Sequence, residues 1–207
     1  MKTQQTVQFP PFSGTRCLMM PYIQGDPASI SDTFDAYRDI VGSVCIRRGD
    51  IGFLTIDESV AAAGTPHRGA RAKHGRALHT EARIDPERSY CWGSGGGWGK
   101  PPHRVTLERD TQILLANNVD KSCAVWDAEH EDTSDDGDIG DRAALYPYGE
   151  ATLMLAGEVH SIGILTPHES LPVTVDTPRQ FLRIVGSGVH GREEYFTRNP
   201  LMPEYKP

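Results

Sequence analysis

The sequence predicts a mainly β protein in which a short helical cap precedes an antiparallel, barrel-like core. Glycine and proline are abundant, with 21 and 15 copies in 207 residues, and this composition favours short strands joined by turns over long helices. Short apolar runs bounded by Gly, Pro, Asp and Asn follow one another from residue 51 to residue 185. Strand-like and helical stretches do not alternate, so a parallel doubly wound sheet is disfavoured.

The N-terminal part is expected to supply an arm and the cap. Residues 1–15 are polar and interrupted by proline, and they are predicted to form an extended arm. The segment 29–41 is predicted as one amphipathic helix, because large apolar side chains recur along it at helical spacing. These side chains are Ile30, Phe34, Tyr37 and Val41.

The strands of the core are expected at the short apolar runs, which are rich in β-branched residues. These runs are 51–56, 105–107, 112–116, 122–126, 151–155, 159–165, 171–175 and 181–185. The β-barrel core would then span 50–186 and leave 187–207 as a C-terminal tail. No linker divides the chain, so residues 1–207 are expected to form a single domain.

The charge, hydropathy and cysteine pattern exclude several classes of protein. A net charge of −7 argues against a nucleic-acid backbone as the main partner. No apolar leader and no membrane-length apolar run is visible, so a cytoplasmic protein is expected. The four cysteines are widely spaced and form no C-x-x-C pair, which favours buried free thiols over a metal ribbon or a disulfide framework.

The tripeptide His79-Thr80-Glu81 is the first candidate for a metal site. In an extended chain, residues two apart point to the same side, so His79 and Glu81 can both reach one ion. On a helix the two side chains would diverge, so this interpretation requires an extended segment. The tripeptide is weak evidence alone, because a surface carboxylate beside a polar strand residue would look the same.

A second histidine and two arginines occur later in the chain. His168 ends a strand-like stretch, and Arg179 opens the next one. Arg179, Phe181 and Arg183 share one face of that strand by alternation. Two inward-facing arginines would need an anionic partner, and a carboxylate ligand held by paired hydrogen bonds is the natural candidate. His160 remains an alternative to His168 as the distal ligand.

The order of these residues resembles the Fe(II)/2-oxoglutarate-dependent oxygenases. The resemblance rests on His-x-Glu, a distal His in His168-Glu169-Ser170-Leu171-Pro172-Val173, and Arg179 on the following strand. It implies a double-stranded β-helix of the cupin-like, jelly-roll type. It also implies iron bound by His79, Glu81 and His168. Most members of the family have Asp where this chain has Glu81, although some amino-acid-hydroxylating members have Glu.

The same resemblance implies roles for the two arginines. Arg179 would bind the far carboxylate of 2-oxoglutarate. Its spacing to Arg183 is also similar to the taurine dioxygenase and clavaminate synthase group, which makes Arg183 the expected contact of an anionic substrate group. The expected substrate is a small molecule, such as an amino acid or another carboxylate.

A glycine-rich segment, residues 91–99, is a candidate lid over the substrate. Trp92 and Trp98 would supply its aromatic substrate contacts. An ordinary glycine-rich loop would have the same composition. The segment matches neither a P-loop nor a dinucleotide-binding fingerprint.

Two other functions stay open on the sequence. One is a cupin-type metalloenzyme that does not use 2-oxoglutarate, with His79, Glu81 and either His160 or His168 as ligands. The other is a non-enzymatic β-barrel binding protein in which the histidines are incidental. A hydrolase is disfavoured, because no G-x-S-x-G or Cys/His signature is present.

Overall fold

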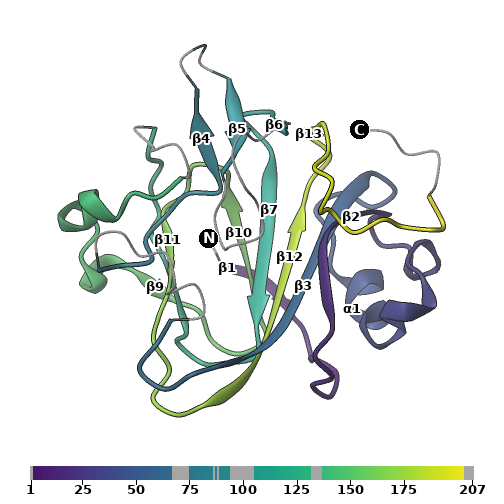
Figure 1. The fold of residues 1–207 in the computed structure, drawn as a ribbon, viewed down its shortest axis with the longest axis horizontal. Coiled ribbons are helices and arrows are strands. Elements are labelled where there is room, and N and C mark those ends of the chain that lie inside the picture. Colours follow the sequence, from purple (N-terminus) through teal and green to yellow (C-terminus); the bar gives the residue numbers. More distant parts are fainter. Residues whose placement is uncertain are drawn as a thin grey trace.

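The computed structural model describes residues 2–66, 75–93 except 86 and 88, 105–131 and 137–202. In these residues the chain forms three antiparallel sheets of six, four and three strands, with short helical segments beside them (Figure 1). The prediction of a mainly β protein with a short helix near the N-terminus is therefore confirmed. No helix in these ranges has the length and apolar character needed to cross a membrane.

The strands are β1 (Lys2–Thr6), β2 (Arg16–Ile23), β3 (Ile51–Ala61), β4 (Ala82–Ile84), β5 (Tyr90–Trp92), β6 (Thr106–Leu107), β7 (Gln112–Asn117), β8 (Cys123–Val125), β9 (Thr152–Leu153), β10 (Glu158–Gly163), β11 (His168–Ser170), β12 (Thr177–Val185) and β13 (Val189–His190). The helical segments are η1 (Pro27–Ser29), η2 (Asp32–Tyr37), α1 (Arg38–Ser43), η4 (Gly140–Leu145) and η5 (Tyr148–Glu150).

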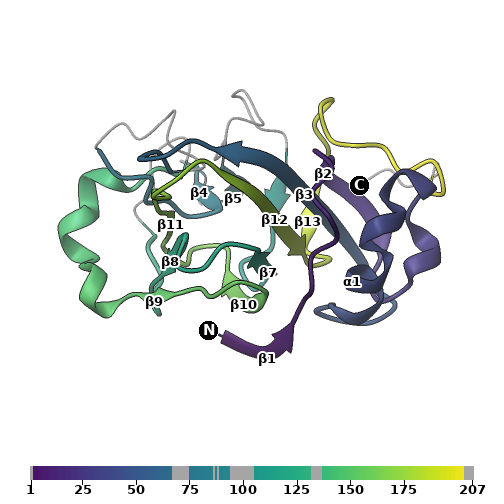
Figure 2. The same ribbon diagram turned by 90° about the horizontal axis from the view of Figure 1, so that it is seen from below.

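The six-stranded sheet has the order β1-β10-β7-β12-β3-β2 and separates two cores. In Figure 2, α1 lies on one side of β3 and β12, while β8, β9 and β11 lie on the other. Leu54 and Leu182 pack on the helical side, whereas Phe53 and Val185 pack with residues of the smaller sheets. Alternation along β3 and β12 therefore supplies both cores from the same two strands.

The smaller sheets have the orders β11-β8-β9 and β13-β6-β5-β4. An isolated antiparallel bridge adds His79 to the edge of β11. The hydrogen-bonded strand orders do not join the three sheets into a closed barrel in the described residues. The core predicted as a barrel is therefore made of separate sheets in the described residues.

The prediction of one helix over 29–41 was wrong. The segment is divided into η1, η2 and α1, and Phe34 has non-helical angles of φ −112° and ψ 22°. Because a helix this short is only marginally stable by itself, packing of its side chains decides the backbone. Phe34 and Tyr37 are buried against the sheet, which favours tight turns over a straight helix.

The predicted strand at 171–175 was also wrong, because the strand in this region is β11, which ends at Ser170. Leu171 donates its N–H to the carbonyl of Ser122, and Pro172 makes only an isolated bridge with Pro66. Proline has no N–H to continue a ladder, so the pairing stops there.

Other strands were missed or are longer than predicted. Strand β1 lies within the expected arm, and β13 lies within the expected tail. Strand β2 was missed because it is buried almost throughout and its register shifts between Cys17 and Met20. Strands β3 and β12 extend past the predicted runs, and this extension brings Ser59 and Arg179 into register.

A buried carboxylate ties the N-terminal segment to the sheet. Glu58 on β3 accepts hydrogen bonds from the Tyr37 hydroxyl at 2.6 Å, from Gln180 Nε2 at 2.8 Å, and from the backbone N–H groups of Ser13 and Thr15. Burial alone would raise the pKa of Glu58, but these hydrogen bonds outweigh it and lower the pKa from 4.5 to about 2.

Replacing Glu58 with Gln is therefore expected to lower the free energy of unfolding at pH 7 by about 2–3 kcal/mol. Because the folded-state pKa is depressed, the contribution is full above the unfolded value of 4.5 and is lost as pH falls toward 2. Urea unfolding at pH 7 and pH 3 measures both effects. Glu129→Gln is the control, since Glu129 is exposed; equal losses in the two variants would contradict the prediction.

Candidate metal centre

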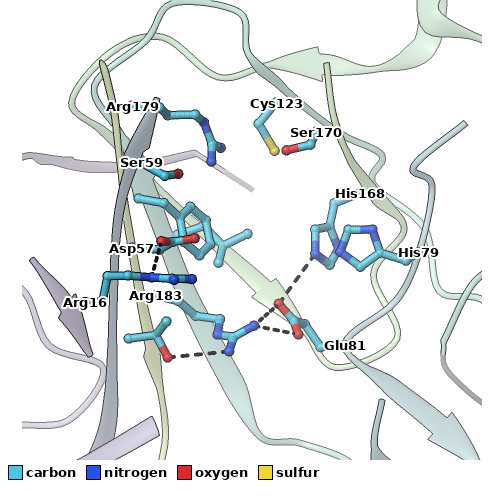
Figure 3. A pocket seen from close by; sticks show the side chains of 13 residues that line it. Arg16, Asp57, Ser59, His79, Glu81, Cys123, His168, Ser170, Arg179 and Arg183 are labelled. Carbon is cyan, nitrogen blue, oxygen red and sulfur yellow. Dashed lines mark hydrogen bonds and ion pairs between the residues drawn. The ribbon is translucent and has the colours of Figure 1, made fainter. Parts of the chain in front are cut away.

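Three buried side chains of metal-binding type converge in the structure. The ligand atoms of His79, Glu81 and His168, hereafter the triad, all lie within 4.8 Å of one another (Figure 3). None of the three residues is more than 7% exposed. The prediction that these residues meet is confirmed, and their spacing suits one metal ion; their role as ligands stays a prediction.

Backbone pairing brings the two histidines together. His79 and His168 donate their N–H groups to each other's carbonyl oxygens, both at 3.0 Å. Their rings lie 4.0 Å apart between centroids. His79 lies in an isolated β-bridge and Glu81 lies in a bend directly before β4, so the segment is not helical and is strand-like on both sides of the bend. Residues two apart in such a segment reach the same side.

Both imidazoles are oriented by a carbonyl oxygen two residues earlier. His79 Nδ1 lies 2.6 Å from the Ala77 oxygen, and His168 Nδ1 lies 2.9 Å from the Thr166 oxygen. A carbonyl oxygen can only accept, so Nδ1 is the donor in each contact and Nε2 is the ring nitrogen left to bind a metal. The Nε2 of His168 lies 3.6 Å from Oε1 of Glu81. This is the arrangement that orients metal-binding histidines in proteins.

Gly137 packs against the middle of the His-x-Glu segment. Its carbonyl accepts the N–H of Thr80 at 2.9 Å, and a Cβ on Gly137 would lie 2.6 Å from the Thr80 oxygen. Its φ of +75° is in the left-handed region that favours glycine. This close approach leaves no room for a side chain beside the triad.

Replacing Gly137 with Ala is expected to weaken Co(II) binding by roughly 10-fold or more, because Thr80 must move and carry its two neighbours with it. Gly64→Ala is the matched control, since Gly64 has φ +74° but open space around it. The alanine should cause about the same backbone strain in both variants, because the two glycines have nearly the same φ. Co(II) titration followed by absorption measures the difference, and equal affinities would rule out the steric argument.

Arg183 is bound to the carboxylate of the triad. Its Nη1 donates to both oxygens of Glu81 at 2.9 Å, and its Cζ lies 4.6 Å from the centroid of the Trp92 ring. The sequence predicted Arg183 and Trp92 as substrate contacts but did not predict their contact with each other. Trp98 lies outside the described residues.

A cavity of about 190 Å³ connects the triad to Arg179. Figure 3 shows Arg179 with Ser59, Cys123 and Ser170 at one end, while Arg183 and Glu81 lie at the other. Arg179 is 2% exposed, and its Nε and Nη1 have no hydrogen-bond partner among the described residues. Burial lowers the pKa of this guanidinium. A buried guanidinium is costly unless its charge and its donors are compensated, so Arg179 is a candidate for binding an anion.

Sequence reasoning missed part of the cavity wall. Asp57 lines the cavity and pairs with Arg16 Nε at 3.2 Å. Thr55, Asp57 and Ser59 share one face of β3 by alternation. A predicted strand that continued past residue 56 would have placed Asp57 and Ser59 on this face.

His160 does not belong to the triad. It lies on β10, is 1% exposed, and its Nε2 lies 3.2 Å from Glu158 Oε2. Its carboxylate neighbour satisfies this ring nitrogen away from the cluster. The geometry therefore favours His168 as the distal ligand.

Comparison with protein-family models, curated proteins and solved structures found no match for this chain. The function therefore has to be argued from the chemistry of the site.

Proposed function

We propose that this protein is an Fe(II)/2-oxoglutarate-dependent oxygenase that oxidises a small molecule. The observation that carries the proposal is a cavity with the triad on its wall and, at its end, a buried guanidinium whose Nε and Nη1 have no hydrogen-bond partner among the described residues. The first suits a metal with open coordination positions, and the second suits the far end of an anionic co-substrate.

The donor set fits Fe(II). Two neutral imidazoles and one carboxylate form the facial arrangement of non-haem iron oxygenases, which leaves positions for a co-substrate and oxygen. His79 and His168 would bind through Nε2, because each Nδ1 is held by a backbone carbonyl. Glu81 would bind through one oxygen while Arg183 holds the carboxylate in place.

The cavity fits a small dicarboxylate. One end of 2-oxoglutarate would reach the metal, and the other would receive hydrogen bonds from Arg179. Ser59 and Ser170, at the same end of the cavity, are placed to assist. The volume of about 190 Å³ suits a small molecule better than a bulky ligand.

The order of strands supports a double-stranded β-helix. Along the chain, β3 lies in the six-stranded sheet and the His79 segment pairs with β11 of the three-stranded sheet. Strand β7 returns to the first sheet, β8 and β9 lie in the second, β10 in the first, β11 in the second and β12 in the first. Repeated crossing between two facing sheets is the pattern of jelly-roll folds.

Bound iron and 2-oxoglutarate would supply the oxidation, in which one oxygen atom enters the substrate C–H bond and the other enters succinate as CO₂ is lost. The chain itself would hold and orient the reactants. Arg183 has a buried Nε without a hydrogen-bond partner among the described residues, and this donor is available for an anionic substrate group such as a carboxylate. Trp92 supports that guanidinium from its ring face.

The test is an anaerobic titration of the Fe(II)-loaded protein with 2-oxoglutarate. We expect a weak visible charge-transfer absorption that is absent from the His168→Ala variant. Metal binding without this absorption would favour a cupin-type metalloenzyme that does not use 2-oxoglutarate. A protein that takes up no metal would instead be a binding protein.

A further inference from the structure

A largely buried ion pair lies behind the triad, on the face of β11 that points away from the cavity. Glu169 stands between His168 and Ser170, so its side chain leaves the opposite face of the strand. It is 3% exposed. Arg76 donates to its Oε2 from Nη2 at 2.6 Å and from Nε at 2.9 Å. The other oxygen accepts the N–H of Ala77 at 3.1 Å.

The rest of the Arg76 guanidinium contacts backbone carbonyl groups and aromatic rings. Nη1 donates to the carbonyl oxygens of Ala143 and Tyr146 at 3.1 and 3.0 Å. The Tyr148 and Trp126 rings lie 4.3 and 5.3 Å from Cζ. The Tyr148 hydroxyl donates to Glu169 Oε2 at 3.2 Å. A largely buried pair with this many partners has one well-defined geometry.

Each histidine has a backbone partner on its other side, since His79 bridges Asp138 and His168 pairs with Val125 of β8, but the direct pairing of the two histidines with each other is short. They pair through one isolated bridge and its two backbone hydrogen bonds. A slip of one residue between paired strands turns each side chain to the other face, which would take an imidazole out of the cavity. Glu169 directly follows His168, and it joins the segment before His79 by its ion pair with Arg76 and by accepting the N–H of Ala77.

We infer that Arg76 and Glu169 are positioning residues that fix the pairing of His79 with His168 and thereby the relative placement of the two imidazoles. The pair is neutral as a whole, so it acts on the site through geometry and adds no net charge. The inference deepens the proposed function. It depends on that function only for the claim that the two imidazoles bind a metal.

The experiment compares Arg76→Met, which removes the guanidinium, with Arg76→Lys, which keeps the charge without the planar fork. Val41→Ala is the control for a general loss of stability, because Val41 is fully buried in the core on the helical side of the sheet. Amide hydrogen exchange of the metal-free proteins is measured first. Co(II) affinity and the Co(II) absorption spectrum are measured next, at a temperature where every variant is folded.

In Arg76→Met we expect exchange at His79 and His168 to accelerate at least 10-fold relative to Leu182 and Ile184 of β12. Outer partners of metal ligands are typically worth 10–100-fold in metal affinity, and we expect a loss of about that size together with an altered spectrum. In Arg76→Lys, the exchange rates at the two histidines and the Co(II) affinity should both lie between those of Arg76→Met and the wild type. Val41→Ala should lower the midpoint of thermal unfolding without a selective rise in exchange at the two histidines and without a loss of Co(II) affinity.

Accelerated exchange at the two histidines without any Co(II) binding by the wild type would support the positioning role and overturn the proposed function. Wild-type Co(II) binding with unchanged exchange and affinity in Arg76→Met would overturn the positioning role alone. Exchange that rises uniformly, as in Val41→Ala, would also overturn it.

Discussion

The His168→Ala variant should lose metal binding almost completely while keeping its fold. It removes one of the three proposed ligands, so the loss should exceed the roughly 10–100-fold that is typical of removing an outer partner. The main-chain pairing with His79 does not depend on the imidazole, so the strand should stay in place. Isothermal titration with Co(II), with circular dichroism to check folding, measures the effect.

His160→Ala is the matched control for this experiment. It removes an equally buried imidazole that lies on β10 beside Glu158 and outside the triad. Its Co(II) affinity should stay close to that of the wild type, although its stability should fall. If His160→Ala lost the metal and His168→Ala kept it, the distal ligand would be His160 and the assignment above would be wrong.

The Arg179→Met variant should fail to bind 2-oxoglutarate while becoming more stable without ligand. Each charge-assisted hydrogen bond lost is worth about 1.5–3 kcal/mol, so two should raise the half-saturating concentration by about 100-fold or more. The stability should rise because an apolar side chain replaces a buried guanidinium whose Nε and Nη1 lack partners in the described residues. Metal affinity should change little.

Three measurements separate this expectation from its alternatives: the 2-oxoglutarate titration, the thermal midpoint of the ligand-free protein, and Co(II) affinity. Arg179→Lys is the control, since it keeps the charge but not the paired geometry, and it should weaken 2-oxoglutarate binding without the gain in stability. Unchanged 2-oxoglutarate binding in Arg179→Met would remove this residue from the co-substrate site and favour a metalloenzyme of another kind.

The His79–Glu81 part of the triad could be predicted because its signal is local. His79 and Glu81 are two positions apart, and an extended backbone turns that spacing into a shared direction. The alternation of Arg179 and Arg183 placed both on one face for the same reason, and the register of β12 against β3 agrees with it. Such periodic relations need no knowledge of distant parts of the chain.

The failures were of a different kind. The helix expected over 29–41 became short turns because buried contacts of Phe34 and Tyr37 outweighed a weak helical preference. Strand β2 was hidden by its irregular register between Cys17 and Met20. The pairing of Arg183 with Glu81 joins residues 102 positions apart, and no local pattern indicates it.

By itself, then, the sequence determined the mainly β class, the candidate ligands and the face that carries the two arginines, because alternation is a property of the local backbone. Only the tertiary structure decided that His168 joins His79 while His160 does not, and that backbone carbonyls orient both imidazoles. It also decided that Arg183 binds Glu81 through Nη1, while Nε and Nη1 of Arg179 have no hydrogen-bond partner among the described residues. These outcomes depend on which residues, distant in sequence, are buried next to one another. Burial makes an uncompensated charge or an unsatisfied polar group costly, and this cost selects one arrangement.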